Sequence, residues 1–199
     1  MKFLVIEGNI GSGKTTLAKM LADDLNAKLI LEQFADNPFL PKFYKDQEKY
    51  SFSLELSFLA DRYNQVKKEV LNLDLFHPLT IADYYFAKTA IFAQNTLKPD
   101  EYRLFRQIFN MVADNIPKPD LYVFLHADIS KLLENIKKRG RDYEQNISAG
   151  YLEKISEGYF SYFKGISSFP ILIVDVNQID FVKYSEHFTL LKETLFKSD

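Results

Sequence analysis

The 199-residue sequence has no cysteine and no tryptophan, and only three histidines. Without cysteine the chain forms no disulfide and has no thiol nucleophile, which suits a reducing compartment, so we expect a cytoplasmic protein. The histidines His77, His126 and His187 are too scattered to predict a zinc site. The absent tryptophan contrasts with 18 Phe and 12 Tyr, most of which we expect in the core, with a few left to line a pocket for a flat ligand.

An excess of one charge and long apolar runs are also missing. The formal net charge is −2, so no basic field predicts a nucleic-acid partner. No apolar stretch approaches the roughly 20 residues that cross a bilayer, and we expect no membrane partner. A strand pattern begins at residue 2, so we also expect no signal peptide.

Short apolar runs alternate with longer stretches of helical periodicity. The runs are continuous rather than alternating, which is typical of parallel strands covered on both faces; they are 2–7, 28–32, 79–83, 120–126 and 171–175. The helical stretches are 14–25, 49–72, 84–97, 100–115, 128–139, 148–165 and about 178–196. This order predicts one α/β domain over 1–199, with a five-stranded parallel sheet between two helical layers.

The most specific motif lies between the first strand and the first helix. Residues 8–15 read Gly-Asn-Ile-Gly-Ser-Gly-Lys-Thr, which fits the phosphate-loop pattern G-x-x-x-x-G-K-[ST]. Its glycines permit backbone angles that turn successive N–H groups toward a phosphate chain, Lys14 supplies a cation, and the Thr15 hydroxyl can bind Mg²⁺. We therefore predict a nucleoside triphosphate site formed by Gly8, Asn9, Ile10, Gly11, Ser12, Gly13, Lys14, Thr15 and Thr16.

Two carboxylates follow neighbouring predicted strands. Glu32 ends the second strand and Asp83 ends the third, so both point toward the phosphate loop if the sheet is parallel. Phosphoryl transfer needs an acid that holds the metal and an acceptor for a proton, and these residues are the candidates. Solvated carboxylates in turns are the alternative.

A basic segment, 137–141, reads Lys-Lys-Arg-Gly-Arg. Arg139 and Arg141 can pair with phosphate oxygens, and Gly140 between them can act as a hinge, so we predict a lid over about 139–147. A solvated helix end is the simpler alternative.

Three segments resemble the deoxyribonucleoside kinases, enzymes that transfer the γ-phosphoryl of ATP to the 5′-hydroxyl of a deoxynucleoside in nucleotide salvage. The segments are 7–16 (EGNIGSGKTT), the stretch from 29–32 through 37–40 and 43–44 to Arg62, and 139–145 (RGRDYEQ) with 151–152. They occur in the family's order and spacing over residues 1–165.

The resemblance implies roles for particular side chains. Glu32 corresponds to the general base, which needs neighbouring cations to stay ionised; the lid arginines could supply them. Tyr44 and Glu144 correspond to the pair that holds the 3′-hydroxyl. Arg62 corresponds to a residue facing the base and Phe92 to a ring stacked on it. Phe92 could instead belong to the core, and Tyr44 to the core or the surface.

The sequence departs from the family at two positions. The third strand ends in Asp83-Tyr84-Tyr85, without the arginine that usually follows the acid, and Lys88 is the nearest replacement. Glu55 stands where the family has a base-reading glutamine. An ionised carboxylate only accepts hydrogen bonds, which favours guanine and hence purine deoxynucleosides, unless Arg62 pairs with Glu55.

Two other functions remain possible from the residues. A nucleoside monophosphate kinase of the thymidylate kinase type shares the loop and the lid, but it usually keeps the missing arginine. A nucleotide-binding protein with weakened catalysis is the second alternative. The resemblance also implies a homodimer, with the aromatic-rich stretch 84–115 as the candidate face.

Overall fold

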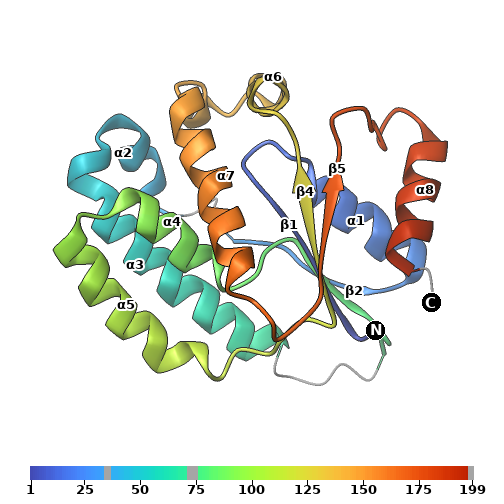
Figure 1. Cartoon of the computed structure of the whole chain (residues 1–199), viewed down its shortest axis with the longest axis horizontal. Helices are drawn as coiled ribbons and strands as arrows, with labels where there is room; N and C mark the ends of the chain where they lie inside the picture. Colours follow the sequence, from blue (N-terminus) through green and yellow to red (C-terminus); the bar gives the residue numbers. More distant parts are fainter. Residues whose placement is uncertain (34–36, 71–75, 197–199) are drawn as a thin grey trace.

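The computed structural model describes residues 1–33, 37–70 and 76–196. Its centre is one parallel sheet with the strand order β2-β3-β1-β4-β5 (Figure 1). The strands are β1 (Phe3–Gly8), β2 (Lys28–Ile30), β3 (Thr80–Ala82), β4 (Leu121–His126) and β5 (Ile171–Asp175). The predicted α/β architecture is confirmed, and each strand begins and ends within two residues of the predicted range.

Helices cover both faces of this sheet (Figure 1). They are α1 (Lys14–Leu25), α2 (Leu40–Lys45), α3 (Gln47–Gln65), α4 (Lys88–Thr96), α5 (Pro99–Ala113), α6 (Ile129–Arg139), α7 (Ala149–Lys164) and α8 (Ser185–Phe196). A π-helical turn (Val66–Val70) extends α3, and a short 3₁₀ turn (Asp142–Glu144) follows α6. No helix among the described residues is long and apolar enough to cross a membrane.

The two faces of the sheet carry different side chains because successive strand residues point to opposite sides. Leu4 and Ile6 of β1 pack with aliphatic residues of α1, α6 and α8. Val5 lies on the other face, together with Tyr122 and Phe124 of β4, and packs against α4 and α7. The aromatic residues therefore concentrate on the side of the sheet where α4 and α7 lie.

The helix predicted over 84–97 begins only at Lys88, because residues 84–87 form a buried turn. Tyr84, Tyr85 and Phe86 are all buried, but each packs into a different hydrophobic cluster. One face of a helix could not direct three consecutive side chains into three separate clusters. The backbone N–H of Tyr85 also donates to Oε1 of Glu7 at 2.9 Å. Tertiary contacts thus override the local helical pattern.

Two other helix predictions were wrong in their extent. The stretch about 178–196 is helical only from Ser185, because the Asp180 carboxylate accepts from the backbone N–H groups of Val182 and Lys183 and holds a turn there. The stretch 49–72 begins two residues earlier and changes to the π-helical turn after Gln65; residues 71 and 72 lie outside the described residues. The short helix α2 was not predicted.

Candidate active site

The phosphate loop connects β1 to α1 at the carboxyl end of the sheet. Gly11 and Gly13 have φ angles of 85° and 90°, which side-chain-bearing residues rarely adopt. Gly8 does not use this freedom, because its φ is not positive. Gly8 is required instead because a Cβ there would lie 2.8 Å from the carbonyl oxygen of Leu125.

Side chains from α6 and α7 hold the loop in place. The Asn9 amide donates to the carbonyl of Leu152 and to the Ser156 hydroxyl, each at 2.8 Å, and accepts from the N–H of Ile10. Asn135 of α6 donates to the carbonyl of Gly11 at 2.8 Å. Asn9 therefore fixes the loop through its side chain and leaves only its backbone for a phosphate.

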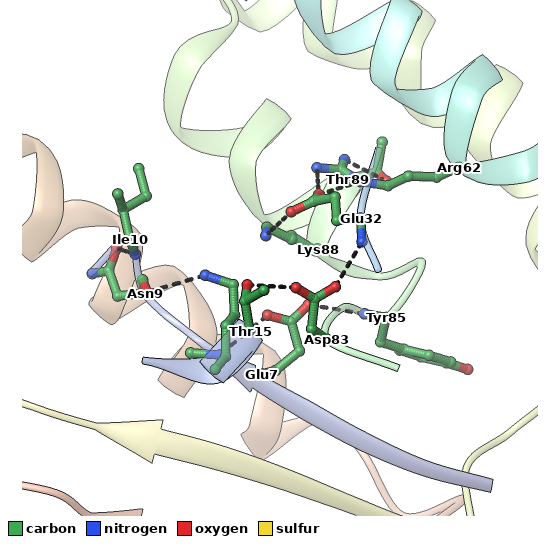
Figure 2. A network of polar contacts seen from close by, with 12 residues as sticks. Glu7, Asn9, Ile10, Thr15, Glu32, Arg62, Asp83, Tyr85, Lys88 and Thr89 are labelled. Carbon is green, nitrogen blue, oxygen red and sulfur yellow. Dashed lines mark hydrogen bonds and ion pairs between the residues drawn. The ribbon is translucent and has the colours of Figure 1, made fainter. Parts of the chain in front are cut away.

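Lys14 and Thr15 begin α1 beside the predicted acid of β3. The Thr15 hydroxyl donates to Oδ2 of Asp83 at 2.5 Å, and Oδ1 of Asp83 accepts from the N–H of Glu32 at 2.6 Å (Figure 2). Burial, followed by the charge of Lys88, lowers the pKa of Lys14 to about 8. An anionic ligand would reverse this effect, so the site favours phosphate at the Lys14 ammonium.

Glu32 lies between two cations. Oε1 accepts from Nε and Nη2 of Arg62 at 2.9 and 2.5 Å, and Oε2 accepts from Nζ of Lys88 at 2.6 Å (Figure 2). Burial acts to raise the pKa of Glu32, but the charges of Lys88 and then Arg62 outweigh it and hold this pKa well below its usual value. The cations that keep Glu32 ionised are thus Arg62 and Lys88, where the lid arginines had been expected.

The Arg62 guanidinium is occupied by these contacts. Its remaining terminal nitrogen, Nη1, donates to the Thr89 hydroxyl at 2.9 Å, and the group lies 4.5 Å from the ring centre of Phe58. The hydrogen bonds of Arg62 therefore go to Glu32 and Thr89 rather than to Glu55. The Glu55 carboxylate instead accepts from the Thr96 hydroxyl at 2.9 Å.

The two arginines of the predicted lid converge on Glu144. Arg139 ends α6, Gly140 follows with φ 72°, and both Arg139 and Arg141 donate to the buried Glu144 carboxylate. The Tyr143 ring stacks on Tyr44, with ring centres 5.9 Å apart. Gly140 has open space around its Cβ position, so its role is the left-handed backbone and not close packing.

The predicted catalytic and acceptor residues line one cavity, which we call the acceptor cavity. It encloses about 730 Å³, part of it open to solvent. Its lining includes Lys14, Thr15, Glu32, Tyr44, Glu55, Arg62, Lys88, Phe92, Arg139, Arg141 and Glu144. Phe92 also contacts the core through the Tyr159 ring, so the core and ligand roles of Phe92 are compatible.

A second cavity also borders the phosphate loop, and we call it the donor cavity. It is lined by residues 11–16, by Lys131, Asn135 and Lys138 of α6, and by the segment 176–183 except Asn177 and Gln178. The two cavities share Lys14, Thr15, Arg139 and Arg141. Groups bound in the two cavities would therefore meet between the phosphate loop and the lid.

Two features of the site were missed from sequence. The fully buried Glu7 accepts from the N–H groups of Gly8 and of Tyr85, the latter drawn in Figure 2. It also accepts from the Tyr159 hydroxyl, so it ties the phosphate loop to the turn before α4 and to α7. The sequence signal that could have indicated this role of Glu7 is a charged residue at the end of an otherwise apolar strand. Residues 179–183, which also line the donor cavity, were taken as part of the helix predicted over about 178–196, and nothing in their pattern predicted a cavity wall.

The oxygens of Thr15 and Asp83 fit a partial magnesium site. Mg²⁺ prefers oxygen ligands and takes most of them from phosphates and water, so two protein oxygens suffice. The described residues contain no group of three or more His, Asp or Glu that could bind a metal ion alone. The donor set thus suits a metal that arrives with a phosphate ligand.

Comparison with known proteins gives consistent matches. A family model described as "Deoxynucleoside kinase" matches residues 4–197. The deoxyguanosine kinase of Bacillus subtilis is 38% identical over 90% of this chain and 89% of its own length. The deoxyadenosine/deoxycytidine kinase of that organism is 30% identical, covering 89% and 83%. The structure of deoxyadenosine kinase from M. mycoides with bound dATP superimposes with a TM-score of 0.85 and 25% identity, covering 98% of this chain and all of that one.

Proposed function

The chain belongs to the deoxynucleoside kinase family and is an ATP-dependent kinase of deoxynucleosides, and for this activity we propose that Glu32 is the general base and a purine deoxynucleoside the preferred substrate. The observation that carries the assignment is the pair of cavities that share Lys14, Thr15, Arg139 and Arg141, with Glu32 on the acceptor side. ATP occupies the donor cavity and the deoxynucleoside occupies the acceptor cavity.

In this mechanism Glu32 accepts the proton of the 5′-hydroxyl. The 5′-oxygen forms a bond to the γ-phosphorus, the bond from that phosphorus to the β,γ-bridging oxygen breaks, and ADP leaves with the electron pair. The single contact that Oε2 of Glu32 makes with Lys88 leaves this oxygen a lone pair for the hydroxyl. The low pKa of Glu32 keeps it ionised and available at neutral pH.

The cations around the transfer position stabilise the charge on the phosphoryl group. Lys14 lies on the phosphate loop, and Arg139 and Arg141 lie on the lid across from it. We propose that Lys88 supplies the charge of the arginine missing after Asp83, because its ammonium is buried beside Glu32. Bound Mg²⁺, held by Thr15 and Asp83, would neutralise charge on the phosphate oxygens.

Binding of the acceptor is assigned to the remaining cavity residues. Tyr44 and Glu144 hold the 3′-hydroxyl, which couples sugar binding to the position of both lid arginines, since these donate to Glu144. Phe92 stacks on the base and Glu55 contacts its edge. The purine preference is supported by Glu55 and by the deoxyguanosine and deoxyadenosine kinases among the relatives.

A coupled assay of ADP release tests the proposal. Deoxyguanosine and deoxyadenosine should each give turnover above the rate with ATP alone, and deoxynucleoside monophosphates should not. Turnover only with monophosphates would establish the thymidylate kinase alternative, and turnover with neither would establish a binding protein. A preference for thymidine in a four-substrate competition would overturn the purine assignment.

We also propose a homodimer in the cytoplasm. The exposed side chains of Leu104 and Met111 on α5 support an apolar contact on this helix. Light scattering of the purified chain measures the mass directly, and a monomer at all concentrations would contradict the dimer.

A further inference from the structure

Glu55 is a buried acid in the wall of the acceptor cavity. It lies on α3, its residue is only 2% exposed, and it faces the same cavity as Phe92 and Arg62. The ion pairs of Arg62 and Lys88 are with Glu32. Glu55 therefore sits in a charged site without a cation bonded to it among the residues described.

The surroundings give Glu55 fewer donors than a carboxylate needs. The Thr96 hydroxyl lies 2.9 Å from Oε1 of Glu55 and 3.0 Å from the carbonyl oxygen of Phe92, and its single proton serves only one of them fully. Oε2 of Glu55 is buried and has no hydrogen-bond partner in the described part of the chain. A buried ionised carboxylate so poorly solvated is costly unless it gains a proton or a ligand brings donors.

Charged and titratable groups surround Glu55 from every element of the cavity. Burial raises the pKa of Glu55 to about 7, and the charge of Arg62 opposes this effect. The other titratable groups that face the cavity are Lys14 of α1, Glu32 after β2, Tyr44 of α2, Lys88 of α4, Arg139, Arg141 and Glu144 of the predicted lid, and Tyr151 of α7. Both protonation states of Glu55 are consequently populated near neutral pH.

The two purines present different hydrogen-bonding groups to such a carboxyl group. Adenine offers a donor, its amino group, next to the acceptor N1. Guanine offers two adjacent donors, N1–H and its amino group. A protonated carboxyl is a donor beside an acceptor, and an ionised one is two acceptors.

We propose that Glu55 selects the purine through its own protonation: ionised Glu55 accepts from both donors of guanine, whereas Glu55 protonated on Oε2 donates to N1 of adenine and accepts its amino group on Oε1. The proton is exchanged with solvent before the base binds. This inference rests on the proposed function and adds that base preference changes with pH.

The direct test is a competition between deoxyguanosine and deoxyadenosine with ATP over pH 6 to 8.5. The kcat/KM for deoxyguanosine divided by that for deoxyadenosine should rise with pH. The rise reaches a limit of about tenfold per pH unit when guanine requires the ionised form of Glu55 and adenine the protonated form. Both substrates share the enzyme, the donor and the base Glu32, so other titrations cancel in the ratio. A flat or falling ratio in the wild-type chain would overturn the inference.

Glu55→Gln is the matched variant, because its amide is always a donor beside an acceptor. It should favour deoxyadenosine at every pH, with a ratio that no longer depends on pH. The Thr96 hydroxyl stabilises the ionised form of Glu55, so Thr96→Val should move the fall in kcat/KM for deoxyadenosine to higher pH. Thr96→Ser keeps a hydroxyl and should return this fall to the pH seen in the wild type. A pH-dependent ratio that persists in Glu55→Gln would also overturn the proposal.

The two levels of the proposal fail differently. If ADP release with ATP needs no deoxynucleoside at any pH, the proposed function fails and the inference fails with it. If both purine deoxynucleosides are phosphorylated but the ratio does not rise with pH, only the role of Glu55 fails. Thermal unfolding of each variant identifies a loss of activity that comes from misfolding.

Discussion

The ammonium of Lys88 lies 2.6 Å from Oε2 of Glu32. Lys88 is the first residue of α4, at the end of the buried turn that begins after Asp83. A cation is therefore present near the position where the family's arginine is absent, although it comes from the next helix. Its contact with Glu32 keeps that carboxylate ionised and leaves one side of it open to the acceptor cavity.

Replacing Lys88 tests whether its ammonium takes the role of the arginine that is absent after Asp83. Lys88→Ala should lower kcat by about 10²- to 10³-fold, because the site loses a charge beside the transferring phosphoryl group and the partner of Glu32. Lys88→Arg should retain most of the activity. Lys98→Ala, which breaks the exposed Lys98–Glu48 pair, is the control and should leave kcat unchanged. Wild-type turnover in Lys88→Ala would show that Lys88 has no role in transfer.

Asp83→Asn tests the magnesium site. The amide oxygen can still accept from the N–H of Glu32, but the charge that attracts a cation is lost. The Mg²⁺ concentration for half-maximal rate should rise about 10- to 100-fold, while the KM for the deoxynucleoside changes little. An unchanged magnesium dependence would mean that Asp83 only anchors Thr15 and the backbone after β2.

Glu55 also affects stability in a predictable direction. Its pKa rises from an ordinary 4.5 to about 7 on folding, so the folded chain binds a proton between these values that the unfolded chain has released. The free energy of unfolding should therefore fall as pH rises from 4.5 to 7, by on the order of 3 kcal/mol from this group. Denaturant unfolding of wild type and Glu55→Gln at several pH values measures it. Parallel curves for the two proteins would contradict the shift.

Gly11→Ala should destabilise the phosphate loop. The residue has φ 85°, and a Cβ would lie 2.7 Å from the carbonyl oxygen of Leu132. We expect a loss of more than about 2 kcal/mol in the free energy of unfolding, together with loss of ATP binding. Gly150→Ala is the matched control: Gly150 lies in the first turn of α7 with open space around it, and alanine there should stabilise by up to about 1 kcal/mol.

The parts of the fold that were predictable are those encoded locally. The apolar run 171–175 predicts β5 correctly, and the motif around Lys14 and Thr15 predicts the loop between β1 and α1. The beginning of α4 was not predictable, since it depends on where Tyr84, Tyr85 and Phe86 find space in three separate clusters. Such information exists only after the chain has folded.

The site shows a similar division. Sequence order and resemblance placed Glu32, Glu55 and Arg62 in one cavity, and the structure brings them together there. Their pairing was not accessible, because Arg62 lies within reach of both acids and only the geometry assigns it to Glu32. The bridging role of Glu7 depends on contacts with Tyr85 and Tyr159, far from it in sequence.

The aromatic face of the sheet makes the protein spectroscopically simple. Since the chain has no tryptophan, its ultraviolet emission comes from tyrosine alone, and Tyr122 and Tyr159 lie fully buried between the sheet and α7. Burial raises the pKa of both phenols well above the usual value, so neither forms phenolate while this layer is intact. Ionisation of these two phenols, followed by alkaline difference absorption, therefore requires α7 to open from the sheet. A single tryptophan introduced elsewhere would be a background-free probe.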